Sequence, residues 1–181
     1  HNIWPIKTAL LRKGKFNVES YSTFLLGPIK GKTLEEIEIL TKPFAEELVK
    51  KYSDSLTRKL IDLHRLDICL ITSGSLSFLV KEISNLLEIK QYFGTEAEVK
   101  EGKYTGSLKG VPNFSQEKVR RVREWISLSK QSIDTEIFSY SDSILDLPML
   151  EFANHPILVE PDERLSTIGE ERQWKKLKRF N

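Results

Sequence analysis

The stretch that decides the fold is residues 67–75, which read Asp-Ile-Cys-Leu-Ile-Thr-Ser-Gly-Ser. Its first part, Asp67 to Thr72, is a mostly apolar run of strand length that leads into a turn made of serine and glycine. A helix is expected directly afterwards, because leucine and isoleucine recur there at helical spacing. These positions are Leu76, Leu79, Ile83, Leu86 and Leu87. An apolar strand followed by such a turn and helix is typical of a parallel α/β sheet.

Helices are expected before this strand, and further strands after it. Residues 1–65 have helical patterns with short breaks, and Thr33 with Glu36 forms a capping box that opens one helix. Pro43 is expected to end or kink that helix. The remaining expected elements are a helix at 55–65, a hairpin of strands at 96–100 and 104–107, a helix that Asn113 and Gln116 can cap, strands at 136–140, 156–159 and 176–180, and helices at 147–152 and 163–172.

The composition excludes several classes of protein. Among 181 residues, Lys and Arg number 28 and Asp and Glu 26, so the net charge is only +2 and binding to nucleic acid is not expected. Cys69 is the single cysteine, which excludes an intrachain disulfide and favours a reducing compartment, so a cytoplasmic location is expected. No apolar run is long enough to cross a bilayer, and no membrane partner is expected. No oligomeric state is predicted.

Thr72 and the residues after it form a candidate anion site. Ligands of open α/β sheets bind at the carboxyl ends of the strands. Thr72 offers a hydroxyl there, and the backbone N–H groups of Ser73 to Leu76 are expected where a helix begins, which favours a bound anion. The alternative is that Ser73, Gly74 and Ser75 only form a turn and cap the helix.

Asp142 and Asp146 form a candidate metal site. They lie four residues apart, after the strand predicted at 136–140 and before a helix. Two carboxylates at the end of a strand suit Mg²⁺, which keeps water and phosphate oxygens as its other ligands. The alternative is that these acids only stabilise the N-terminus of the following helix.

Lys118 is a candidate for neutralising phosphate charge. It is expected in the first turn of a helix, where a cation is mildly unfavourable, so something other than the helix is expected to hold it. The alternative is an ordinary solvated lysine beside Arg120, Arg121 and Arg123. A hydroxyl, then a lysine, then an acidic pair would place a phosphoryl contact, a cation and a metal site along one edge of a sheet.

This order of motifs resembles the haloacid dehalogenase superfamily, specifically its phosphoserine-phosphatase-like subfamily. The resembling stretches are Ile68 to Thr72, Asn113 to Val119 around Lys118, Tyr140 to Pro148 around the acidic pair, the hairpin region 94–106 and the closing strand region 155–162. The resemblance covers almost the whole chain. It implies a Rossmann-like α/β core with a parallel sheet over residues 61–181 and a small all-helical cap over residues 1–60.

The resemblance also implies an activity, which is Mg²⁺-dependent hydrolysis of a small phosphorylated metabolite through an aspartyl-phosphate. Thr72, Ser73, Gly74 and Lys118 would bind the phosphate, and Asp142 with Asp146 would hold Mg²⁺. Asp146 would orient a metal-bound water or Lys118. Thr72, Lys118 and Asp146 would thus be the catalytic residues of this chain.

Two departures from the family pattern matter. The motif Asp-x-Asp, which supplies the family's nucleophile, does not occur in these residues. We therefore expect the nucleophile to lie outside the sequence, on the central strand of the sheet, and these 181 residues alone to be inactive. Leu145 stands where many relatives have asparagine.

Two other interpretations compete with the enzyme. One is a catalytically inactive module of the same fold that binds a phosphometabolite or a protein partner. The other is a nucleotide-cofactor protein, which is disfavoured because the sequence lacks Gly-x-Gly-x-x-Gly.

Overall fold

A computed structural model describes residues 24–129 and 135–179, so the helices expected within residues 1–23 lie outside the described residues. The chain forms two compact units, residues 1–113 and 114–181, and parallel strands occur in each. Helices mixed with parallel strands confirm the predicted α/β class. None of the helices in the described ranges is long and apolar enough to cross a membrane. The cap boundary near residue 60 stays a prediction.

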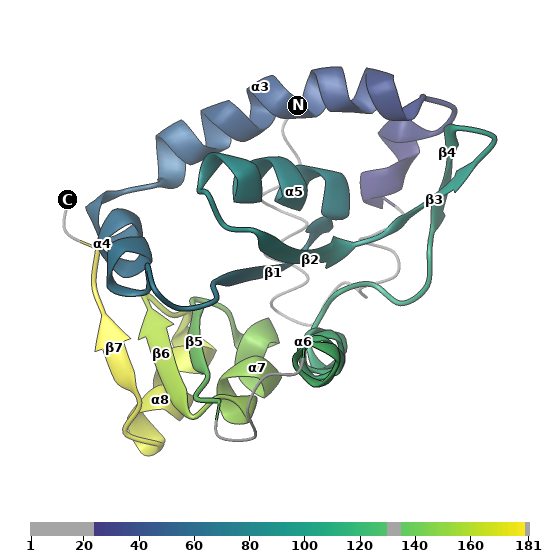
Figure 1. Cartoon of the computed structure of the whole chain (residues 1–181). Helices are drawn as coiled ribbons and strands as arrows, with labels where there is room; N and C mark the ends of the chain where they lie inside the picture. The colour runs from purple at the N-terminus through teal and green to yellow at the C-terminus, as the bar shows by residue number, and fades with distance from the viewer. Residues whose placement is uncertain (1–23, 130–134, 180–181) are drawn as a thin grey trace. The chain divides into compact units, whose positions relative to one another are not determined.

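Two helices open the described part of the first unit, α3 (Leu34–Tyr52) and α4 (Ser55–Leu63). The capping box is confirmed, because the Glu36 N–H donates to Thr33 Oγ1 at 3.1 Å and the Thr33 N–H donates to Glu36 Oε2 at 2.8 Å. The buried positions of α3 recur at four-residue intervals and are Ile37, Thr41 and Ala45. Helix α3 packs along α5 (Ser77–Leu86), as Figure 1 shows.

Pro43 does not end α3. The helix continues for nine residues beyond it, to Tyr52. Proline has no N–H, so the carbonyl of Ile39 loses its partner within the helix. Ile39 is 65% exposed, which allows water to replace the lost bond.

The strand predicted at 67–72 is β1, but it runs from Leu70 to Leu76. It pairs in parallel with β2 (Gln91–Thr95), a strand that the sequence analysis did not predict. The pairing is regular up to Thr72 opposite Phe93, then irregular until Leu76 meets Thr95. The prediction that the strand ends at Thr72 is therefore wrong, because the backbone stays extended to Leu76. The regular pairing with β2 does end at Thr72.

The predicted hairpin is confirmed. Its strands are β3 (Ala97–Lys100) and β4 (Lys103–Leu108), which pair antiparallel. The 3-10 helix η1 (Gly27–Ile29) lies against β4.

The second unit alternates helices with a parallel sheet in the order β5-β6-β7. Its elements are α6 (Gln116–Leu128), β5 (Phe138–Ser141), η2 (Ile144–Asp146), α7 (Leu147–Phe152), β6 (His155–Val159), α8 (Glu163–Glu171) and β7 (Lys175–Leu177). Leu150, Leu158 and Leu165 are completely buried and form its core. The predicted order of elements is confirmed. The last strand ends at Leu177 rather than at residue 180, which lies outside the described residues.

Both parallel sheets have an open edge within the described part of the chain. Strand β1 has β2 on one side and no described strand on the other. Strand β5 likewise has β6 as its single described neighbour. The N–H and C=O groups along each open edge have no ladder partner from a described strand.

Gly94 allows β2 to approach the start of α5 closely. A Cβ atom at this position would lie 2.6 Å from the Ser77 Cα and 2.9 Å from the Ser75 carbonyl oxygen. Both are backbone atoms, so neither can move aside without shifting the strand or the helix.

We expect Gly94→Ala to lower the free energy of unfolding by about 1–3 kcal/mol, as overpacking does in other buried sites. Urea unfolding measures the effect. Gly27→Ala is the matched control, because a Cβ there has no atom within 4 Å, and it should change stability far less. Equal stability of the two variants would contradict the close approach.

Candidate active site

The first group of candidate residues lies where β1 leaves its regular register. Thr72 is the last residue in regular pairing, and Ser73 and Gly74 follow in the irregular stretch. The expected helix start at Ser73 is wrong, because α5 begins at Ser77 with Leu76 as its N-cap. The N–H groups of Ser73 to Leu76 therefore belong to extended backbone rather than to the first turn of a helix. Ser75 donates its N–H to Ser73 Oγ at 3.2 Å.

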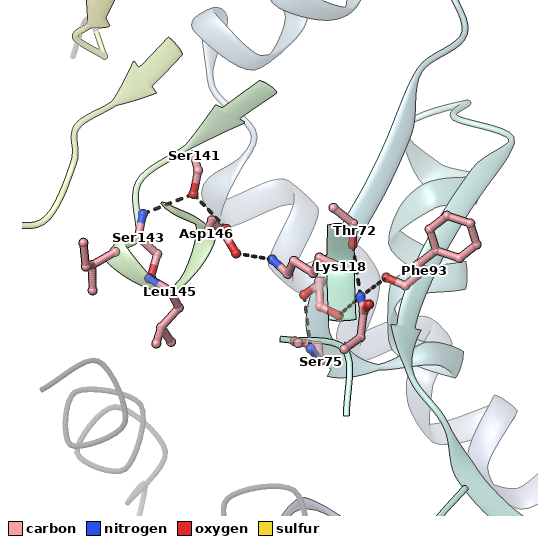
Figure 2. Close-up of polar contacts among 12 residues, drawn as sticks. Thr72, Ser75, Phe93, Lys118, Ser141, Ser143, Leu145 and Asp146 are labelled. Atoms are coloured by element: carbon pink, nitrogen blue, oxygen red, sulfur yellow. Dashed lines mark hydrogen bonds and ion pairs between the residues drawn. The ribbon is translucent and has the colours of Figure 1, made fainter. Parts of the chain in front are cut away.

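Asn113 holds this strand end through its side-chain amide. Its Nδ2 donates to Thr72 Oγ1 at 3.0 Å, to the Ser73 carbonyl at 2.9 Å and to the Phe93 carbonyl at 3.2 Å (Figure 2). These bonds occur where the ladder between β1 and β2 breaks, so one side chain replaces missing strand pairing. The prediction that Asn113 caps the next helix is wrong, because Ser115 is the N-cap of α6.

Thr95 adds a second set of bonds to the same strand end. Its Oγ1 accepts the backbone N–H of Asn113 at 3.1 Å and donates to the Gly74 carbonyl at 2.8 Å. Thr95 and Asn113 are both completely buried. The carbonyls of Ser73 and Gly74 are therefore satisfied by two buried side chains instead of by the backbone of β2.

The Asn113 Oδ1 is buried and has no hydrogen-bond partner among residues 24–129 and 135–179. A buried acceptor left in this state costs about 1–3 kcal/mol. The amide cannot flip to relieve the cost, because its oxygen would then face the Ser73 and Phe93 carbonyls, which only accept hydrogen bonds.

The second group of candidate residues lies in the second unit and centres on an ion pair. The Lys118 Nζ donates to Asp146 Oδ1 at 2.5 Å (Figure 2). The Lys118 side chain is 7% exposed and that of Asp146 20%. The expectation that something other than the helix holds Lys118 is confirmed, since the charge of this buried lysine is balanced by a carboxylate on η2.

Serine hydroxyls fix the loop that carries Asp146. The Ser141 Oγ donates to Asp146 Oδ2 at 2.8 Å and accepts the Ser143 N–H at 3.2 Å. Ser143 in turn accepts the Leu145 N–H at 3.3 Å. Both oxygens of the Asp146 carboxylate are thus already bonded to residues of this unit.

Asp162 ties the same loop to the next strand end. One of its oxygens accepts the Leu165 N–H at 3.0 Å and so caps α8. The other accepts the Ile144 N–H at 2.7 Å. The Asp162 N–H also donates to the Asp142 carbonyl at 2.8 Å. The loop between β5 and α7 is therefore fixed at several points.

Asp142 fits a magnesium ligand better than Asp146 does. Asp142 follows β5 directly and is exposed, whereas the Asp146 carboxylate is partly buried against Lys118. No group of three His, Cys, Asp or Glu side chains lies together within the described ranges. Mg²⁺ commonly uses only one or two protein carboxylates, with waters and substrate phosphate completing the shell. The donor set around Asp142 suits that mode of binding.

Glu117 anchors the first turn of α6, beside Lys118. It accepts hydrogen bonds from Arg120 at 2.8 Å and from Arg121 at 2.9 Å. The hydrogen bond from Arg120 is the largest cause that lowers the pKa of Glu117 from 4.5 to about 2. The helix that carries Lys118 is thereby stabilised by an ionised acid near its N-terminus.

Several residues of these two groups were not singled out for chemistry from the sequence, among them Asn113, Ser141 and Asp162. Asn113 was assigned to a helix cap, and Ser141 and Asp162 were noted only as parts of longer stretches. Ser141 has a weak sequence signal, because it lies directly before Asp142 at a strand end. Asn113 has none, because its partners are 20 to 41 residues away in the chain.

Comparison with known proteins gives one family and several relatives. The family model for haloacid dehalogenase-like hydrolases matches residues 4–151. A histidinol-phosphatase of Neisseria meningitidis serogroup C is 26% identical over 168 residues, which are 90% of this chain and 76% of that protein. Phosphoserine phosphatase SerB1 of Mycobacterium tuberculosis is 29% identical over 150 residues, which are 81% of this chain and 48% of that protein.

A solved structure supports the fold. A protein of unknown function from Bordetella pertussis Tohama I superimposes with a TM-score of 0.78 at 26% identity. The match covers 96% of this chain and 79% of the Bordetella chain.

We expect Lys118→Met to lower the free energy of unfolding by about 3 kcal/mol, because it leaves the Asp146 carboxylate partly buried without its cation. Urea unfolding measures the loss. The double variant Lys118→Met/Asp146→Leu should recover part of it, since no unpaired charge then remains.

Lys42→Met is the matched control. Lys42 pairs with Glu38, and the two side chains are 54% and 51% exposed. Its loss should cost far less stability than the loss of Lys118, because water screens an exposed pair. Similar losses for Lys118→Met and Lys42→Met would contradict a strong buried pair.

The low pKa of Glu117 predicts a pH dependence of stability. Its ordinary value is 4.5 and its folded value is about 2, so its contribution is fully present above pH 4.5 and is lost as the pH falls toward 2. Glu117→Gln should lower the urea midpoint at pH 7 and change it little at pH 2. Glu124→Gln, on a 58% exposed side chain that also pairs with Arg120, should have a much smaller effect at both pH values.

Proposed function

Since the chain belongs to the haloacid dehalogenase-like hydrolase family, as a phosphoric monoester hydrolase, we propose that it cleaves a small phosphomonoester through an aspartyl-phosphate, with the help of Mg²⁺. The observation that carries the proposal is the buried Lys118–Asp146 ion pair beside Asp142. A buried lysine needs a partner, and a carboxylate that holds it in one place leaves its remaining N–H donors available to a second anion. We take phosphate to be that anion, and the match to a family of hydrolases supports this choice.

The proposed chemistry has two steps. A carboxylate attacks the phosphorus atom, the ester bond to the substrate alcohol breaks, and an aspartyl-phosphate forms. Water then hydrolyses this intermediate and releases inorganic phosphate. Covalent catalysis of this kind replaces one difficult displacement by two easier ones.

We assign the attacking carboxylate to an aspartate outside these residues, because the sequence contains no Asp-x-Asp. The 181 residues alone should accordingly lack activity. The cytoplasmic location inferred from the single cysteine is part of the same proposal.

Each candidate residue has a proposed role. The Thr72 hydroxyl and the Ser73 and Gly74 backbone would bind phosphoryl oxygens. Lys118 would offset the charge that grows on these oxygens during transfer. Asp146 would keep Lys118 in position, because both of its oxygens are already engaged with Lys118 and Ser141.

Asp142 would hold Mg²⁺, which supplies charge neutralisation at the phosphate when it is bound. The Asp142 carbonyl is fixed by the Asp162 N–H, so the backbone that carries this carboxylate is held in place. Asp146, the other expected ligand, already uses lone pairs of both oxygens to bind Lys118 and Ser141, which leaves fewer for a metal. We therefore propose Asp142 as the principal protein ligand.

The substrate is proposed as a class. The histidinol-phosphatase and phosphoserine phosphatase similar to this chain are named for phosphate esters of small amino-bearing alcohols. Phosphoserine and histidinol phosphate are accordingly the first compounds to test, together with a panel of other phosphometabolites.

We expect the full-length protein to hydrolyse p-nitrophenyl phosphate with Mg²⁺ and to lose this activity in EDTA. Asp142→Ala should lower kcat/KM by about 100-fold or more, because the metal loses its principal ligand. Release of nitrophenolate measures the rate.

Asp62→Ala is the matched control, because Asp62 is an exposed carboxylate on α4, and it should retain full activity. Equal turnover in EDTA, or an unaffected Asp142→Ala, would contradict the proposal. A full-length protein that binds phosphometabolites without hydrolysing any of them would instead favour the inactive module.

A further inference from the structure

We propose that Asn113 is a positioning residue, which fixes the Thr72 hydroxyl as a hydrogen-bond donor toward the phosphoryl group. This inference rests on the proposed function, because it gives Thr72 a task in phosphoryl transfer. It adds a residue to which neither the family match nor the sequence motifs assign a role. All the contacts that carry it lie within the first unit.

The polarity of the hydrogen bond between Asn113 and Thr72 is fixed by their neighbours. The Asn113 Nδ2 faces the Ser73 and Phe93 carbonyls, which can only accept. The amide nitrogen must therefore be on this side, where its two N–H groups are shared among the two carbonyls and Thr72 Oγ1. An amide nitrogen does not accept hydrogen bonds, so the hydroxyl proton of Thr72 is directed to a different acceptor. A phosphoryl oxygen is an acceptor of the required kind.

The same side chain also sets the backbone after Thr72. The Ser73 carbonyl accepts a hydrogen bond from Asn113 and therefore points toward it. In a planar trans peptide the following N–H points the opposite way. The Gly74 N–H is thus directed away from Asn113. Thr95 fixes the next carbonyl, that of Gly74, through its hydroxyl. One buried cluster therefore orients both a hydroxyl and a peptide N–H of the candidate phosphate-binding stretch.

The bonds from Asn113 to the Ser73 and Phe93 carbonyls stabilise the strand end, but the same side chain also carries a cost. Its Oδ1 is buried without a partner among the described residues, which is unfavourable for folding. Its bond to Thr72 also spans 41 residues, so it is not a local turn interaction. A group that only filled space here would avoid the unpaired oxygen, whereas a group that must donate at this point cannot.

A double-mutant cycle in the full-length protein tests the inference. We expect Asn113→Ala and Thr72→Val each to lower kcat/KM for p-nitrophenyl phosphate by about 10- to 100-fold, as small misplacements of catalytic groups do. The double variant should lose clearly less than the product of the two single losses, because part of the effect of Asn113 passes through the Thr72 hydroxyl. In a Thr72→Ser background, which keeps the hydroxyl, Asn113→Ala should still lower kcat/KM.

Ser84→Ala separates this role from general destabilisation. Ser84 is completely buried in the same unit and donates its hydroxyl to the Ile89 carbonyl. Its removal should lower the melting temperature without changing kcat/KM. Multiplicative losses in the Asn113/Thr72 cycle would overturn the inference, because they would show that Asn113 acts independently of the hydroxyl.

A second measurement applies if the Asn113 variants do not fold. The NMR signals of the Asn113 side-chain amide protons should differ between the wild type and Thr72→Val. Identical signals in the two proteins would overturn the inference. A wild-type protein without phosphatase activity would overturn this inference and the proposed function together. An active wild type with independent effects at Asn113 and Thr72 would overturn this inference alone.

Discussion

Where β1 leaves its regular register with β2, backbone carbonyls lose the partners that a strand would give them, and buried carbonyls must find others. Asn113 and Thr95 meet this constraint by donating to the carbonyls of Ser73, Phe93 and Gly74. The extended path of β1 to Leu76 depends on these bonds. The start of α5 at Ser77 follows from that path, and the closeness of Gly94 to Ser77 follows from both.

The second unit has a comparable constraint, because a nearly buried lysine needs a partner of opposite charge. Lys118 is nearly buried close to the N-terminus of α6, where the helix dipole disfavours a cation. Asp146 compensates this charge, Ser141 holds Asp146, and Asp162 holds the loop between β5 and α7. Glu117 compensates the neighbouring arginines on the same helix turn. The result is a short segment in which each charged group has a defined partner.

Both arrangements hold polar groups in fixed positions, but the groups that they hold are of different kinds. In the proposed site, the first unit would supply neutral donors, a hydroxyl and backbone N–H groups, and the second would supply a cation and an exposed carboxylate. Transfer of a phosphoryl group requires both kinds of group, because binding depends on oriented donors and the developing charge requires a cation or metal. Within each unit, the structure shows which residues hold these groups: Asn113 and Thr95 in the first, and Asp146 and Ser141 in the second.

The sequence by itself determined the class of the fold, the order of nearly all elements and the family. These depend on local signals, namely apolar runs, the Thr33 capping box and the turn residues around Gly74 and Gly102, which act between neighbouring residues. It also determined Thr72, Lys118, Asp142 and Asp146 as candidates, because each lies in a recognisable motif. Only the tertiary structure decided that β2 exists, that α3 passes through Pro43 and that Asn113 bonds to Thr72. It also decided which acid holds Lys118 and which is left exposed. These features depend on partners tens of residues away, and such contacts form only when the chain has folded.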